Sequence, residues 1–227
     1  MSYLLYFLGI IAAIVSMLLS ISVKTKFNKW SKREFESGLT GADVAKKMLM
    51  DAGIYDVEVV QTSGNLSDHY DPRNKTVNLS ESVFCKSNVA AAAVAAHECG
   101  HAIQHNKSYF PLKIRNAIVP VANIGSSSGV YIFMLGMILS RFADFTWMLD
   151  LGIIFFTFSV MFYFITLPVE FNASRRALSV LKKSIFLDRD EIRGAKIVLR
   201  AAAMTYVAAA ASAAIQLFRL VFIRGRD

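Results

Sequence analysis

The chain contains little cysteine, glycine and charge. Of its 227 residues, 2 are cysteine, 12 are glycine and 19% are charged. Two cysteines cannot build a disulfide scaffold, and so few glycines exclude a collagen-like repeat. A hydrophobic share of 55% excludes intrinsic disorder and exceeds the share of about 45 to 50% in ordinary soluble domains. We therefore expect the excess apolar residues to lie in lipid.

Charged residues are missing from four long apolar stretches, each close to the length of about 20 residues that crosses a bilayer as a helix. They predict transmembrane helices at 1–23, 117–140, 151–169 and 201–218. A signal peptide is the competing interpretation of the first stretch, but no basic residue precedes it and no A-x-A-like cleavage site follows it. A soluble alanine-rich helix packed on the bundle is the alternative for the fourth.

The charged residues predict the orientation in the membrane. The short connection from Arg141 to Asp150 predicts a hairpin of the second and third spans, which places segments 24–116 and 170–200 on one side. These two segments hold 21 of the 25 Lys and Arg residues, and the positive-inside rule makes that side cytoplasmic. Two cysteines also suit a reducing compartment. The net charge of +8 then marks topology in a multi-pass protein of the cell (inner or plasma) membrane, and no nucleic-acid partner is expected.

Segment 24–116 is predicted to form a small α+β unit. Residues 39–52 have helical spacing behind Thr40 as N-cap, and residues 57–62 and 76–79 alternate as short strands. Another helix, which Ser87 can cap, extends to about residue 106. Its uncharged part, 87–96, is too short to cross a bilayer. We therefore expect this helix to be buried in protein.

This last helix contains the sequence HECGH. His97 and His101 are four residues apart on one helical face, so both imidazoles can bind one Zn²⁺. Glu98 would then face the metal-bound water and act as general base. With only 4 histidines in the chain, chance does not explain the spacing. The alternative is that both histidines only pack or cap.

A catalytic zinc needs a third protein ligand and an open position. His105 lies about 12 Å along the helix from His97, too far for one zinc to bridge. Glu170 is the better candidate, because it follows Pro168 where the hairpin returns and is expected to open a helix, although a glutamate there can simply complement the helix dipole. Three further candidates lie in the loop before the helix: Asp68, His69 and Asp71.

Three stretches resemble a known family: LSDHYDPRNKTVNLSESVF, AAHECGHAIQH and LPVEFNASRRAL resemble the YugP-type membrane zinc metallopeptidases of bacteria. This family is similar to the HtpX and CAAX-prenyl endopeptidases. The resemblance covers most of the chain and implies a gluzincin-like site, with His97, His101 and Glu170 as zinc ligands and Glu98 as base.

The chain departs from the family pattern at two positions. Asn172 stands where an aspartate is expected, which could weaken a hydrogen bond that orients a ligand. Cys99 stands where valine is usual. It lies about 200° around the helix from His97, so we expect it to point away from the metal as a packing residue.

Together these features predict a mainly α membrane protein with about four transmembrane helices and a small α+β zincin-like cytoplasmic catalytic domain. The predicted activity is that of a zinc-dependent endopeptidase with one Zn²⁺, which cleaves protein or peptide substrates at the membrane face. The strand at 76–79, if it forms a sheet edge, could hold an extended peptide. His69 or Tyr70 could donate to the oxyanion, or be satisfied locally. Arg175 and Arg176 could pair with Glu170 or substrate carboxylates, or contact lipid headgroups.

Two other functions remain open. One is an intramembrane site-2-type metalloprotease, which the short uncharged run before His97 disfavours. The other is a non-proteolytic scaffold or transporter with structural zinc. Spans free of ionisable residues disfavour a transporter, and neither Cys85 nor Cys99 is placed to be a fourth ligand. Small residues at 125–129 permit contact with a membrane-protein partner or a second copy, or packing within the monomer.

Overall fold

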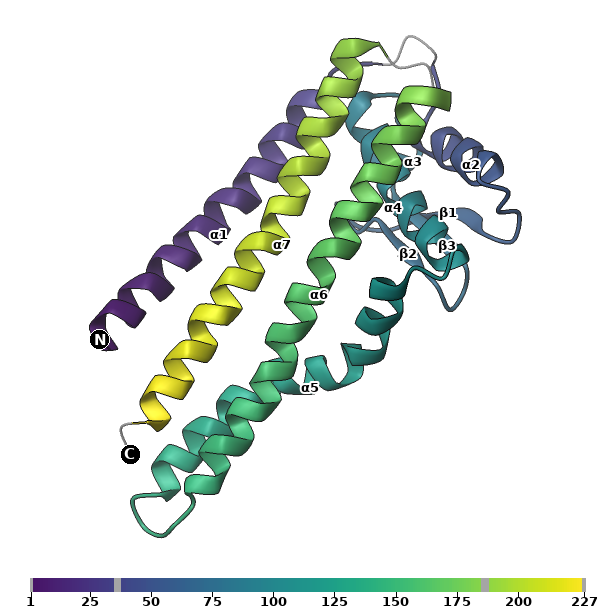
Figure 1. Cartoon of the computed structure of the whole chain (residues 1–227). Coiled ribbons are helices and arrows are strands. Elements are labelled where there is room, and N and C mark those ends of the chain that lie inside the picture. The colour runs from purple at the N-terminus through teal and green to yellow at the C-terminus, as the bar shows by residue number, and fades with distance from the viewer. Residues whose placement is uncertain (1, 35–37, 185–187, 226–227) are drawn as a thin grey trace. The chain divides into compact units, whose positions relative to one another are not determined.

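Long helices dominate the computed structural model, which describes residues 2–34, 38–184 and 188–225 (Figure 1). Four helices are long and apolar enough to cross a membrane. They are α1 (Ser2–Trp30), α5 (Phe110–Leu139), α6 (Thr146–Ser184) and α7 (Arg189–Arg224). The prediction of a mainly α membrane protein is confirmed. The exact membrane boundaries stay a prediction.

The chain divides into two compact units. The first, here called the helix unit, comprises residues 1–19, 113–168 and 205–227. The second, the α+β unit, comprises residues 20–112 and 169–204. Every side chain of the predicted zinc site belongs to the α+β unit.

Helices α5 and α6 pack closely in the helix unit because both carry glycine at their contact. A methyl group at Gly125 would overlap the carbonyl oxygen of Phe155, and one at Gly152 would lie 2.7 Å from the carbonyl oxygen of Gly129. The Ser159 hydroxyl also donates to the carbonyl oxygen of Ala122 at 2.9 Å. Gly125 and Gly129, from the stretch of small residues at 125–129, therefore contact α6 of the same chain. This is the expected packing within the monomer.

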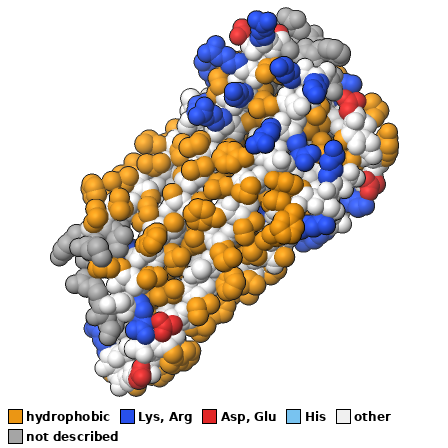
Figure 2. Space-filling model, in the orientation of Figure 1, with side chains coloured by type: hydrophobic (Ala, Val, Ile, Leu, Met, Phe, Trp, Pro, Cys, Tyr) orange, Lys and Arg blue, Asp and Glu red, His pale blue; other side chains and the backbone are white. Residues whose placement is uncertain are grey.

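The outward surface of the helix unit is apolar. Figure 2 shows hydrophobic side chains along the visible face of the long helices. The exposed apolar residues of the helix unit include Phe7, Met17 and Phe218. Near the end of α7, Arg224 pairs with Asp150 at 2.8 Å. An apolar surface with charge at the helix ends is what a lipid-facing bundle requires.

The α+β unit contains α2 (Gly41–Asp51), β1 (Glu58–Thr62), β2 (His69–Asp71), β3 (Thr76–Ser80), α3 (Glu81–Phe84) and α4 (Val89–Asn106). Thr40 caps α2 as predicted, in a reciprocal capping box with Asp43. The strands predicted at 57–62 and 76–79 are confirmed as β1 and β3. Strand β2 was not predicted, because three residues beside a turn carry too short a pattern.

The sheet order is β1-β3-β2, with β3 parallel to β1 and antiparallel to β2. Strand β3 is thus the central strand. The expectation that residues 76–79 form a sheet edge is wrong, because both neighbours take up its hydrogen-bonding groups. The free edges of the sheet belong to β1 and β2.

Helix α4 lies in the middle of the α+β core. Of its 18 residues, 14 are buried, and its alanines let α2, α3 and the sheet approach closely. The prediction that this helix is buried in protein is confirmed. Its N-cap is Asn88, whose side chain accepts from the Ala91 amide at 2.9 Å. The predicted cap, Ser87, is wrong by one residue.

Helix α6 is continuous through Pro168. The expectation that Glu170 opens a new helix is therefore wrong. Proline removes one backbone donor, but membrane helices tolerate that loss. Glu170 is instead held in mid-helix, on a rigid element that continues to Ser184.

Candidate metal centre

Three side chains from two helices converge in the α+β unit. Glu170 Oε2 on α6 lies 3.1 Å from His97 Nε2 and 3.7 Å from His101 Nε2 on α4. One ligand atom from each residue lies within 4.8 Å of the other two. The two rings meet edge to face with centroids 4.8 Å apart. Both Nε2 atoms and one carboxylate oxygen therefore point at a common position.

This arrangement fits a zinc ion. Two histidines and a glutamate are a donor set of catalytic zinc, which binds at about 2.0 to 2.1 Å in tetrahedral geometry. Two ligand atoms of such a tetrahedron are about 3.3 to 3.4 Å apart. The observed separations of 3.1 and 3.7 Å lie on either side of that value.

The His101 ring is oriented by a buried glutamine. His101 Nδ1 donates to Gln104 Oε1 at 3.0 Å, which leaves the Nε2 lone pair toward the cluster. The Gln104 amide in turn donates to the Val169 carbonyl at 2.8 Å and to Asn172 Oδ1 at 3.0 Å. Gln104 thus couples His101 on α4 to the residue beside Glu170 on α6.

The His97 ring is oriented from α6. Its Nδ1 lies 3.2 Å from the Ser174 hydroxyl. In the tautomer whose Nδ1–H donates to that hydroxyl, the Nε2 lone pair is free to bind metal. Asn172 Oδ1 also accepts from Arg176 Nε at 2.7 Å. The amide oxygen of Asn172 therefore receives two hydrogen bonds and fills the acceptor position for which an aspartate was expected.

The two helices come close at Gly100. A methyl group there would lie 2.7 Å from the carbonyl oxygen of Ala173 and 3.1 Å from its Cα. These are backbone atoms of α6, which cannot rotate aside. Gly100 precedes His101, and Ala173 follows Glu170 by one helical turn. The glycine therefore sets the helix separation at the metal centre.

The electrostatics of the cluster favour a cation. Burial would lower the pKa of His101, but the Glu170 carboxylate beside its Nε2 and the charge of Glu98 outweigh burial and raise it. Glu98 is 8% exposed. Among the described residues no hydrogen-bond donor contacts its carboxylate.

The comparisons with known proteins agree with this geometry. The model of the family described as "Putative neutral zinc metallopeptidase" matches residues 5–225. The chain belongs to this zinc metallopeptidase family. It is also 44% identical over 226 residues to "Putative membrane protease YugP" of Bacillus subtilis (strain 168), with 99% of each chain covered. No solved structure matches the chain. The resemblance seen in the motifs is confirmed.

The candidate ligands in the loop before α4 are hydrogen-bonded to residues outside the metal centre. His69 is exposed, and its Nδ1 lies 2.8 Å from the Ser67 carbonyl. Asp68 accepts from the Ser80 amide at 2.7 Å, and its pKa is raised by burial. Asp71 accepts from the Arg73 amide at 2.9 Å. In the described part of the chain, none of these residues joins the His97, His101 and Glu170 group.

The remaining predicted residues also lie outside the cluster. His105 Nδ1 is hydrogen-bonded to the Tyr70 hydroxyl at 2.8 Å, as expected for a residue that is not a ligand. Arg176 contacts Asn172 rather than Glu170, and Arg175 is exposed. Cys99 is buried with Sγ 3.5 Å from the Ala45 carbonyl, so its predicted packing role is confirmed.

Sequence reasoning missed three residues at the site: Gly100, Gln104 and Ser174. Two of them left a signal. A glycine in a helix interior destabilises the helix by about 0.5 to 1 kcal/mol relative to alanine. Gly100 within HECGH therefore indicates a close packing contact. Gln104 lies three residues after His101, on the same side of the helix. Ser174 has no comparable pattern, because its contact with His97 joins residues far apart in the chain.

Proposed function

We propose that the chain is a membrane-anchored zinc-dependent endopeptidase that cleaves protein or peptide substrates. His97, His101 and Glu170 would hold one Zn²⁺, and Glu98 would be the general base. The observation that carries the proposal is the convergence of two histidine Nε2 atoms and Glu170 Oε2, next to the buried carboxylate of Glu98. Membership of a zinc metallopeptidase family supports the same assignment.

A bound zinc would supply Lewis acidity, which lowers the pKa of water and polarises the scissile carbonyl. Glu98 takes the proton of the attacking water and passes it to the leaving amine nitrogen. Gln104 and Ser174 hold the two imidazoles in the tautomer that presents Nε2. Both imidazoles are thus oriented before substrate arrives.

The developing oxyanion needs a further donor, and we retain His69 as an auxiliary residue for this role. Its Nδ1 is engaged with Ser67, which leaves Nε2 for a substrate. Burial and the charges of Asp56 and Asp71 raise the pKa of Tyr70 to about 12. Tyr70 therefore stays protonated at neutral pH, but its hydroxyl is already hydrogen-bonded to His105 and is the weaker choice.

Two observations favour this function over the alternatives. A structural zinc is held by four protein ligands, whereas no fourth His, Cys, Asp or Glu joins the group among the described residues. A site-2-type protease has its motif on a membrane helix, whereas α4 is short and packs inside the α+β unit. A catalytic centre outside the lipid explains both features.

The metal assignment is tested by zinc content. Purified wild-type protein is expected to hold about one zinc per chain. Glu170→Ala should lower zinc affinity by more than about 10-fold. Even the loss of a residue that only orients a ligand lowers metal affinity by about 10- to 100-fold. Elemental analysis after dialysis against a chelator series measures this, with the exposed Glu34→Ala as control. Unchanged zinc content in Glu170→Ala would remove Glu170 from the ligand set.

The cytoplasmic placement of the site is tested with the two native cysteines. Cys85 is exposed and Cys99 is buried, so a membrane-impermeant maleimide should label Cys85 alone. We expect labelling in inside-out vesicles, none in intact cells, and none in Cys85→Ser. Labelling of intact cells would place the α+β unit on the other face, and no labelling in either preparation would favour an intramembrane site.

A further inference from the structure

Strand β1 presents an open edge. The Glu58 amide donates to the Lys75 carbonyl at 3.0 Å, so Glu58 faces β3. In a parallel pair, alternate residues turn both backbone groups to the same side. Val59 and Gln61 therefore direct their N–H and C=O groups away from β3. Among the described residues nothing pairs with this edge.

This edge lacks three common protections of exposed strands. Natural edges are blunted by proline, by lysine or by bulges. Strand β1 has the sequence EVVQT and pairs with β3 in unbroken register. Its edge is therefore suited to accept another extended chain.

An apolar groove of about 430 Å³ flanks the edge. It lies between α2 and β1, and Met50 and Tyr55 in its lining are 57% and 82% exposed. Its apolar lining comprises Leu49, Met50, Ile54, Tyr55, Val57, Val59 and Val60. Apolar side chains of an added strand would find contacts here.

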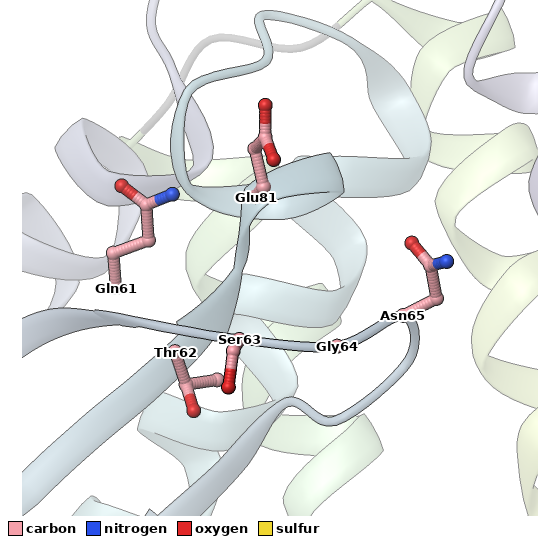
Figure 3. A pocket seen from close by; sticks show the side chains of 6 residues that line it. All are labelled: Gln61, Thr62, Ser63, Gly64, Asn65 and Glu81. Atoms are coloured by element: carbon pink, nitrogen blue, oxygen red, sulfur yellow. The ribbon is translucent and has the colours of Figure 1, made fainter.

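A polar hollow of about 550 Å³ follows at the C-terminal end of β1. Figure 3 shows the polar ends of Gln61, Asn65 and Glu81 projecting toward the same side of this hollow. Glu81 is the single ionisable side chain in its lining. The hollow is thus complementary to a basic side chain.

We propose that the β1 edge binds an extended segment of the polypeptide substrate, away from the scissile bond, as a fourth strand. The inference rests on the proposed peptidase function. Main-chain pairing with Val59 and Gln61 would supply affinity, and the groove and hollow would select apolar residues next to a basic one. Neither recess shares a residue with the His97, His101 and Glu170 group, so this is a second binding site.

A second copy of the chain fits the edge less well. Two β1 strands would bring Glu58 and Glu81 of each copy to the same sheet edge, with Lys46 as the one basic residue in the two linings. Like charges across paired strands are destabilising. A basic substrate segment has the complementary charge.

The test compares a long substrate with a short one. The probes are unfolded β-casein and an octapeptide that spans the bond cleaved in it. Val59→Pro removes an outward N–H that β3 does not use, and Glu81→Lys reverses the charge of the hollow. Each should raise KM for casein about 10-fold, with kcat unchanged and with unchanged KM for the octapeptide. Glu34→Lys, at an exposed glutamate away from both recesses, should change neither.

Each other outcome overturns the proposal. An equal rise in KM for both probes would make the edge part of the primary site, and no change would leave it without a binding role. A wild-type dimer that Val59→Pro dissociates would make a second copy the occupant. If Val59→Pro does not fold, Glu81→Lys decides, since its side chain is exposed.

Failure of the peptidase function is separable from failure of the edge. It would appear as no cleavage of either probe by the wild type. Fluorescence anisotropy of labelled casein then measures binding directly, with the Glu98→Gln background keeping any substrate intact. Casein affinity should still fall about 10-fold with Val59→Pro, and equal affinity would exclude the edge.

Discussion

Glu98→Gln is expected to retain zinc and to lose proteolysis by about 10²- to 10⁴-fold, the usual contribution of a positioned acid or base. Glutamine keeps the size and shape of the side chain, but its amide cannot accept the proton of the attacking water. Glu98 is not among the three residues whose ligand atoms converge. Metal content and catalysis should therefore separate in this variant.

The separation is measured on one preparation, by zinc content per chain and by initial rates on casein. Glu34→Gln is the matched control, because it makes the same chemical change at an exposed glutamate. If Glu98→Gln cleaved casein at the wild-type rate, Glu98 would not be the base. If it lost zinc together with activity, Glu98 would belong to the metal site.

The chemistry of the site could be predicted from the sequence because it is local. The spacing of His97 and His101 is one helical turn, so both histidines share a face in any intact helix. The four apolar helices were likewise predictable, since each contains a long continuous run without charge. Glu170 needed more than spacing: its place after the third span suggested it, and the family resemblance selected it from the loop candidates.

What could not be predicted depends on contacts between distant segments. Strand β3 is central because the chain returns after β2 and inserts β3 between β1 and β2. No local pattern in residues 76–79 indicates that order. Pro168 predicts a break in soluble helices, yet α6 passes through it. Gln104 reaches Val169, 65 residues further along the chain. Only the packed helices place that amide beside the carbonyl.

The strongest dependence of the site on packing is expected at Gly100. Gly100→Ala would ordinarily stabilise a helix interior by about 0.5 to 1 kcal/mol. Here the added methyl group would lie 2.7 Å from the Ala173 carbonyl oxygen, and relieving the overlap must move α6 away from α4. Overpacking of this kind costs about 1 to 3 kcal/mol. Because the same movement withdraws Glu170 from His97 and His101, we expect zinc affinity to fall about 5- to 150-fold.

Gly9→Ala supplies the matched control for this expectation. Gly9 also lies inside a helix, but a methyl group there meets nothing within 4 Å. Competition with a chromophoric chelator measures zinc affinity, and thermal unfolding of the metal-free protein measures packing alone. Both should fall in Gly100→Ala and neither in Gly9→Ala. Lower stability with wild-type zinc affinity would show that the clash is relieved elsewhere, and that the close helix contact does not set the distance between Glu170 and the histidines.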